Sequence, residues 1–199
     1  MKKFILVALC CMSVMTVFAK SEPIDSKYGV GAVTVNSIGR VEFVDEIEIP
    51  VSADLDKCYS GLFTWAKGRF ARPIVLKSDI LSDNNENRRF TMRVQQNLVF
   101  KNSALVTDMA KISYNLNFAI KEANGKKSCV VTMTDISYLY EEDREEGGFS
   151  FAAEDWITDD EAFNKNKTKF LRTTGKFRIK TIDLYNEIVD QTIEIIKAL

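Results

Sequence analysis

The chain has 199 residues, a formal net charge of −1 and no histidine. This length is that of one ordinary domain, which buries enough surface to fold without a metal or a disulfide. The near-balanced charge argues against a nucleic-acid partner, which favours a strong basic excess. The lack of histidine excludes Ser-His-Asp and Cys-His catalysis and histidine-ligated zinc, so an enzyme here would have to use carboxylates, lysine or tyrosine.

Residues 1–19 predict a cleaved export signal. Lys2 and Lys3 precede an apolar run over residues 4–18, and Ala19 supplies the small residue that a signal peptidase accepts. The run is shorter than the ~20 residues of a spanning helix, which disfavours a membrane anchor. We therefore expect cleavage near Ala19, no transmembrane segment in the mature chain, and a periplasmic or extracellular location. Cleavage would remove two lysines and no acid, and so would take the net charge from −1 to −3.

The next segment, residues 20–37, is small and polar without a sustained period, which predicts a flexible leader. A single α+β domain is expected over residues 38–199. Alternating apolar residues over 41–49 predict its first strand. Ser52 then fits a helix N-cap, and apolar residues at three- and four-residue steps predict a helix that ends at about Ala71.

Four strands are expected after this helix. A short apolar run over residues 74–81 ends in a polar turn. Strict alternation predicts strands over residues 90–100, 112–120 and 127–140, and an Asn-Gly pair at 124–125 predicts a hairpin between the last two. In the strands over residues 90–100 and 112–120, apolar residues alternate with polar ones, and these apolar residues are predicted to be buried. This set is Phe90, Met92, Val94, Leu98, Tyr114, Leu116, Phe118 and Ile120.

The chain changes character over residues 141–176, where an acidic stretch precedes a basic one. A long irregular connection inside a compact domain is uncommon and often functional. A final helix is predicted from Thr181 or Ile182 to the C-terminus, with one apolar stripe packed on the sheet. Cys58 and Cys129 fall on apolar faces, so both buried free thiols and a disulfide between them remain open.

Together these elements predict an α+β fold: a curved antiparallel sheet of about five strands with two helices on one face, in the order strand, helix, four strands, helix. This order, an aromatic helix and a hairpin resemble the exported bacterial family known as domain of unknown function 4468. The residues that carry the resemblance are Tyr59, Trp65 and Phe70 in the helix, and Tyr114-Asn115-Leu116-Asn117 and Thr134-Asp135-Ile136 in the hairpin. The resemblance covers roughly residues 41–199. It implies a TBP-like fold and secretion by Gram-negative anaerobes, but no activity, because fold alone does not imply function.

Outward positions of two expected strands form a polar, amide-rich surface without an aromatic ring. Its residues are Arg93, Gln95, Asn97, Asn115 and Asn117. Trp156, in the connection, could supply the ring on which a sugar stacks. We therefore weigh a groove between Trp156 and this surface against the simpler alternative, that the connection covers a sheet edge.

Acidic residues near Trp156 suggest two further chemistries. Asp155, Asp159 and Asp160 could act as acid and base on a glycan or could ligate calcium. Nothing fixes these carboxylates at a working separation and no calcium-loop motif is present, which favours a solvated acidic loop. We therefore predict no catalytic residue, no cofactor and no metal site.

The sequence is best explained by a non-catalytic binding or assembly module of the bacterial cell envelope. Its expected partner is an envelope protein or a glycan. The alternative is a carboxylate-dependent hydrolase acting on glycan or cell-wall material. A deep pocket with two facing carboxylates would favour the hydrolase, and a filled core with shallow grooves would favour the binding module.

Overall fold

The computed structural model describes residues 24–71, 73, 75–103, 107–142 and 147–199. Within these residues the fold is built on an antiparallel sheet of seven strands, in the order β1-β2-β6-β5-β4-β3, with β7 paired to β6. The strands are β1 (Thr34–Val35), β2 (Val41–Ile49), β3 (Val75–Asn84), β4 (Arg89–Asn102), β5 (Thr107–Ala123), β6 (Lys126–Tyr140) and β7 (Phe149–Ala152). The expected export signal lies outside the described residues.

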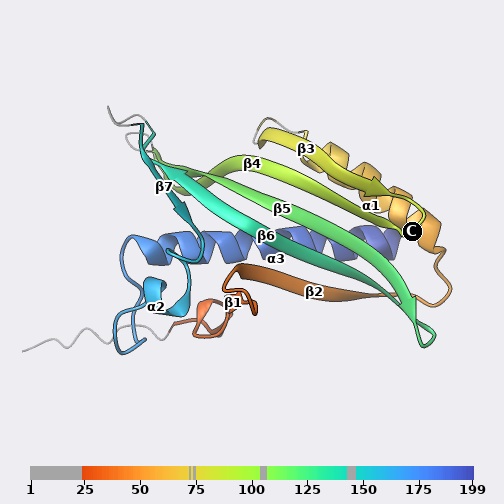
Figure 1. The fold of residues 1–199 in the computed structure, drawn as a ribbon, viewed down its shortest axis with the longest axis horizontal. Helices are drawn as coiled ribbons and strands as arrows, with labels where there is room; N and C mark the ends of the chain where they lie inside the picture. The colour runs from red at the N-terminus through yellow and green to blue at the C-terminus, as the bar shows by residue number, and fades with distance from the viewer. Residues whose placement is uncertain (1–23, 72, 74, 104–106, 143–146) are drawn as a thin grey trace, which may run out of the picture.

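Two long helices cover one face of this sheet and leave the other face open (Figure 1). The helices are α1 (Leu55–Arg69), the single-turn α2 (Asp159–Ala162) and α3 (Thr174–Ala198), and a 3₁₀ turn η1 (Ser26–Tyr28) precedes β1. The predicted α+β class is confirmed. The five predicted strands and the two long helices follow one another in the expected order, and β1, β7 and α2 are additional to them. The sheet has two strands more than the five expected, because β1 and β7 have only two and four residues, too few to show a period.

The core forms between the helices and the face of the sheet that carries the apolar side chains of the strands. All eight residues predicted to be buried on the third and fourth expected strands are buried. Phe90 stacks on Phe118 with ring centroids 4.7 Å apart, and Trp65 of α1 meets Phe118 edge-on at 6.1 Å. The Tyr185 hydroxyl of α3 donates to the Val131 carbonyl at 3.1 Å. The hairpin at 124–125 is also present, since both residues have the positive φ that a two-residue turn of this kind needs.

The first helix begins two residues later than expected. Its N-cap is Asp54 rather than Ser52, because the Asp54 carboxylate accepts hydrogen bonds from the backbone N–H groups of Asp56 at 2.8 Å and Lys57 at 3.1 Å. These bonds favour the ionised form, and the backbone bonds from Lys57 and Asp56 lower the pKa of Asp54.

The last helix begins at Thr174, seven residues before the predicted start at Thr181. The sequence pattern hides its first two turns because Arg178 lies on the inward side, where an apolar residue is expected. Arg178 is fully buried beside Phe177. Its guanidinium binds carbonyl and carboxylate groups of neighbouring loops. The arginine can therefore be buried in the helix, although the sequence pattern predicts an exposed position.

Arg178 fastens the N-terminal segment to the rest of the domain. Its guanidinium donates to the carbonyls of Tyr28 at 2.9 Å, Ile157 at 2.8 Å and Gly29. It also pairs with Asp159 at 2.8 Å. The part of the expected leader that the structure describes, residues 24–37, is therefore ordered by long-range contacts rather than free.

A second contact holds the same segment. The Tyr28 hydroxyl and the Lys27 ammonium both donate to Asp183 Oδ1 of α3, at 2.6 and 2.7 Å. Partial burial would raise the pKa of Asp183, but the hydrogen bonds from Lys27 and Tyr28 outweigh it, and the net pKa is lowered. A carboxyl group with a lowered folded-state pKa stabilises the fold above its unfolded pKa, and this stabilisation is lost as the pH falls through the folded value.

We therefore expect Asp183→Asn to lower the melting temperature at neutral pH. The difference from the wild type should shrink below about pH 4, where the free carboxyl also takes up its proton. Thermal unfolding followed by circular dichroism between pH 2.5 and 7 measures this. Asp190→Asn, an exposed change on the same helix, serves as the control. A wild-type advantage that persists undiminished at pH 2.5 would contradict the assigned role of Asp183.

Both described cysteines, Cys58 and Cys129, are buried free thiols, so of the two open alternatives the structure shows the unbridged one. Burial, and then the neighbouring Cys58, raises the pKa of Cys129 to about 12. Such a thiol stays protonated and unreactive at neutral pH. Among the described residues, no helix has the length and apolar character that a bilayer crossing requires.

Candidate functional site

The open face of the sheet brings together the polar residues singled out in the sequence. In the β4–β5 register, Arg93 lies opposite Asn115 and Gln95 lies opposite Ser113. Asn97 and Asn117 follow on the same face, opposite Lys111 and Thr91. The structure therefore confirms that these five residues, Arg93, Gln95, Asn97, Asn115 and Asn117, share one face of two neighbouring strands.

Hydrogen bonds join these side chains across three strands. Arg93 Nε donates to Asn115 Oδ1 at 3.1 Å, and Asn115 Nδ2 donates to Asp135 Oδ2 of β6 at 2.6 Å. Gln95 Nε2 donates to Ser113 Oγ at 3.1 Å. We call these five hydrogen-bonded residues, Arg93, Gln95, Ser113, Asn115 and Asp135, the polar ladder. Its side chains are held by one another, so their unused donors and acceptors are oriented before any ligand arrives.

Asp135 was not singled out by the sequence reasoning, although a signal for it was present. Inward residues of β6 are odd-numbered up to Met133 and even-numbered from Ile136 on. The change of parity marks a β-bulge, at which two residues of β6 lie opposite the single Tyr114. Asp135 has a positive φ of 51°, which turns its carboxylate to the open face beside Asn115.

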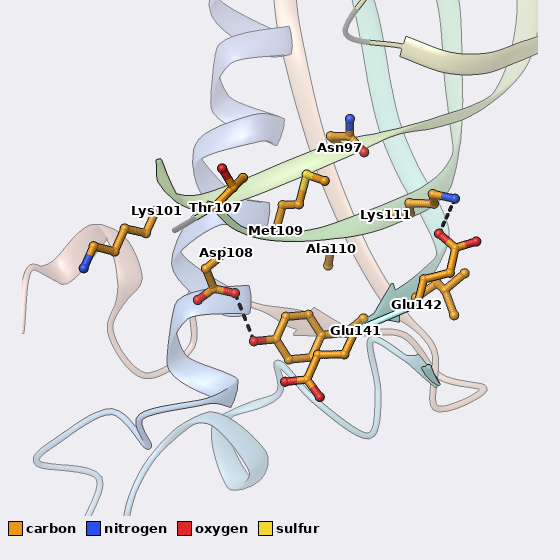
Figure 2. A pocket seen from close by; sticks show the side chains of 11 residues that line it. Asn97, Lys101, Thr107, Asp108, Met109, Ala110, Lys111, Glu141 and Glu142 are labelled. Carbon is orange, nitrogen blue, oxygen red and sulfur yellow. Dashed lines mark hydrogen bonds and ion pairs between the residues drawn. The ribbon is translucent and has the colours of Figure 1, made fainter. Parts of the chain in front are cut away.

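A hollow of about 630 Å³ opens where β4 and β6 end and β5 begins. Asn97 of the polar surface lies on its lining, together with Lys111, Met109 and the start of the connection at Glu141 and Glu142 (Figure 2). Lys111 pairs with Glu142, as the figure shows. The lining thus mixes charged groups with the exposed thioether of Met109 and the partly buried Leu139.

One side of this hollow is a small charge cluster. Asp108 accepts hydrogen bonds from Lys176 at 2.7 Å and from the Tyr140 hydroxyl at 2.9 Å. Burial alone would lower the pKa of Lys176, but hydrogen bonds with Asp108 and Tyr140 outweigh it and raise that pKa. Lys176 also lies 4.5 Å above the Tyr140 ring. Asp108, Tyr140 and Lys176 are therefore bound to one another at this side of the hollow.

A smaller hollow, of about 190 Å³, adjoins the first on the β3 side. It is lined by Lys77 and Asp79 of β3, and by Arg93, Gln95 and Ser113 of the ladder. Gln95 and Asn97 are successive outward residues of β4, so the two hollows are neighbours along one strand.

Trp156 does not belong to this surface. Its ring stacks on Phe151 of β7 at 4.0 Å and meets Phe177 of α3 edge-on at 5.8 Å. Phe177 lies in the core, on the helical side of the sheet. The expected groove between Trp156 and the amide residues does not form, because the sheet separates them. The simpler alternative holds: the connection forms β7, which extends β6 beyond the end of β2.

The acids of the connection also have structural partners. Asp159 pairs with the buried Arg178 and accepts a hydrogen bond from the Gly31 backbone at 2.9 Å. Asp160 pairs with Lys167 at 3.0 Å, and Asp155 is exposed. Among the described residues, no group of three or more His, Cys, Asp or Glu side chains is placed to hold a metal ion.

Comparison with known proteins supports the resemblance seen in the sequence. Residues 43–139 match the family described as a domain of unknown function (DUF4468) with TBP-like fold. Residues 43–139 are a DUF4468 domain. A solved DUF4468 family protein from Bacteroides ovatus is 28% identical, with a TM-score of 0.71 over 85% of this chain and 94% of that one. A solved TBP-like protein from Parabacteroides distasonis is 15% identical, with a TM-score of 0.65 over 82% and 96%. A search of curated proteins found no match.

The DUF4468 domain contains the whole polar ladder and most of the lining of both hollows. Trp156, Arg178 and the helix α3 follow it in the chain. The structural likeness to the Bacteroides protein extends past the matched residues, since it covers 85% of this chain. The TBP-like fold that the sequence resemblance implied is therefore confirmed.

Proposed function

We propose that this chain is a non-catalytic binding or assembly module of the bacterial cell envelope, and that it binds its partner on the open face of the sheet. The observation that supports this most directly is the polar ladder beside the larger hollow, on a sheet face that no helix of the described chain covers. Side chains oriented in advance lose less entropy when a ligand binds.

The chemistry of this surface fits a polar, extended ligand. Amide, hydroxyl and guanidinium groups offer both donors and acceptors, and Met109 adds an apolar contact at the larger hollow. An envelope protein segment or a glycan presents matching groups. The expected export signal would bring the protein to the envelope, and N-terminal sequencing of exported protein should then begin at Lys20.

The hydrolase alternative has less support from the geometry. A glycosidase needs one carboxylic acid that keeps its proton and a second carboxylate at a fixed separation. The carboxylates of the larger hollow instead have cationic partners, Asp108 with Lys176 and Glu142 with Lys111. Both carboxylates are therefore engaged in ion pairs with lysines.

The test combines capture with variants of the open face. Immobilised protein is exposed separately to detergent-solubilised envelope proteins and to cell-wall glycan fragments, and the captured partner is identified and titrated. Met109→Glu and Arg93→Ala should each weaken binding by roughly tenfold or more, since each removes a contact at the interface centre. Their melting temperatures should stay close to that of the wild type, because Arg93 and Met109 are exposed.

Lys57→Ala, on the exposed side of α1, is the matched control and should bind normally. Unchanged binding by both open-face variants would place the site elsewhere. Release of new reducing ends from the glycan fragments, lost in Asp108→Asn, would instead support the hydrolase.

A further inference from the structure

The strand β3 lies at one edge of the sheet and pairs only with β4 (Figure 1). No other described strand lies on its second side, so its outer edge carries backbone N–H and C=O groups that can pair with another chain. Three large apolar side chains on this one strand are exposed: Leu76 at 46%, Ile80 at 43% and Leu81 at 49%. An exposed, apolar edge of this kind is a typical site for pairing with another chain.

The sequence of β3 is nearly symmetric about Ser78. It reads Val75-Leu76-Lys77-Ser78-Asp79-Ile80-Leu81, with apolar residues outside, opposite charges inside and serine at the centre. A strand with this pattern is complementary to itself when turned antiparallel. With Ser78 opposite Ser78 of a second copy, Lys77 lies opposite Asp79 of that copy, and Leu76 lies opposite Ile80.

We propose that two copies of this chain form a twofold-symmetric dimer by antiparallel pairing of their β3 edges about Ser78. A twofold interface brings the same surface of each copy together, and this is the arrangement that a self-complementary strand allows. Directly opposed side chains on one face of an antiparallel pair are close enough to interact, and opposite charges there are stabilising.

The geometry within one copy supports this register. Lys77 and Asp79 pair in the sheet with Gln95 and Arg93, so both side chains stand on the open face. They already reach one another, with Lys77 Nζ 3.1 Å from Asp79 Oδ2. A twofold axis perpendicular to the sheet keeps the open faces of both copies on the same side. Lys77 and Asp79 of each copy can therefore replace their internal ion pair by two ion pairs between the copies.

Irregularities at the ends of β3 limit how far the pairing extends. The register with β4 shifts at Leu76 and again at Leu81, while Lys77 to Ile80 is regular. Bulges and charges also serve to protect an edge from pairing. Here, however, the two charges are of opposite sign and symmetrically placed, which attracts a second copy where two like charges would repel it.

The dimer has a consequence for the open face. The smaller hollow contains Lys77 and Asp79 in its lining, so it lies beside the axis, and each dimer brings two such hollows together. The joined sheets form one continuous open surface. This inference does not depend on what that surface binds, so the dimer and the proposed function can fail separately.

Charge reversal tests the proposed register. By sedimentation velocity the wild-type protein should show a concentration-dependent dimer of the 22.6 kDa chain. Lys77→Asp and Asp79→Lys each place like charges across the axis, and should weaken self-association by roughly tenfold or more. An equimolar mixture of the two variants restores opposite charges on both sides and should form a heterodimer. Lys197→Asp on α3, where the side chain is exposed, should dimerise as the wild type does.

A cross-link provides the second measurement. Ser78→Cys should form a disulfide between copies under mild oxidation, because the two residues oppose one another, while Ser82→Cys on the same strand should not. The native Cys58 and Cys129 are buried and should not compete. A wild-type protein that stays monomeric at all concentrations would overturn the proposal. So would a dimer that survives both reversals, or a mixture of the variants that forms no heterodimer.

Discussion

Arg178→Ala is expected to lower the free energy of unfolding by about 3–5 kcal/mol, because removing one member of a buried ion pair leaves the other uncompensated. Arg178 is fully buried, and its guanidinium contacts Asp159 and the carbonyls of Tyr28 and Ile157. These groups come from two segments, the N-terminal residues around Tyr28 and the connection at residues 157–159. Without the guanidinium, these two carbonyls, the Gly29 carbonyl and the Asp159 carboxylate lose this contact at once.

Urea unfolding followed by circular dichroism measures this loss. Arg178→Met keeps most of the side-chain volume and should be nearly as destabilised as Arg178→Ala, which separates the lost polar contacts from lost packing. Arg172→Ala, at an exposed position before the helix, should change stability by less than about 0.5 kcal/mol. A loss below about 1 kcal/mol for Arg178→Ala would show that the N-terminal segment is held by other contacts.

Leu116→Ala is expected to cost about 2–5 kcal/mol as a large-to-small change in a packed core. Leu116 is fully buried on β5, between Met92 of β4 and Met133 of β6 in register. These neighbours belong to rigid strands, so the cavity left by the missing carbons can close only partly.

The adjacent Asn117 provides the control, because its side chain stands on the opposite face of the same strand. Asn117→Ala should change the free energy of unfolding by less than about 1 kcal/mol, since its hydrogen bond with Thr91 is long at 3.4 Å. Equal losses in the two variants, measured by urea unfolding, would contradict the assigned register of β5.

The parts of the fold that follow a clear period could be predicted from the sequence. The long strands β4, β5 and β6 alternate over many residues, and one buried face requires the register that they show. The same alternation placed Arg93, Gln95, Asn97, Asn115 and Asn117 on one face. A sheet face can therefore be predicted wherever its opposite face is apolar.

The remaining features depend on contacts between distant segments, which a local period does not contain. Arg178 interrupts the apolar stripe of α3, and only its contacts with Tyr28 and Ile157 explain its burial. Trp156 follows the four-residue strand β7, and the pairing of β7 with β6 decides on which side of the sheet it lies. The hollow beside Asn97 likewise needs the ends of three strands to meet.

The bulge at Asp135 makes β6 tolerant of a change of length at one point. Before it, β6 turns its odd-numbered residues inward, and after it the even-numbered ones, including the buried Tyr138. Deleting Asp135 would leave an unbroken alternation in which Ile136 and Tyr138 still face the core and Ser137 still faces outward. Ile136 alone would then lie opposite Tyr114, and the pairs on either side of the bulge would be kept. Related chains should therefore lose a residue at this point more readily than within the regular part of the strand, where a deletion turns the following side chains to the other face.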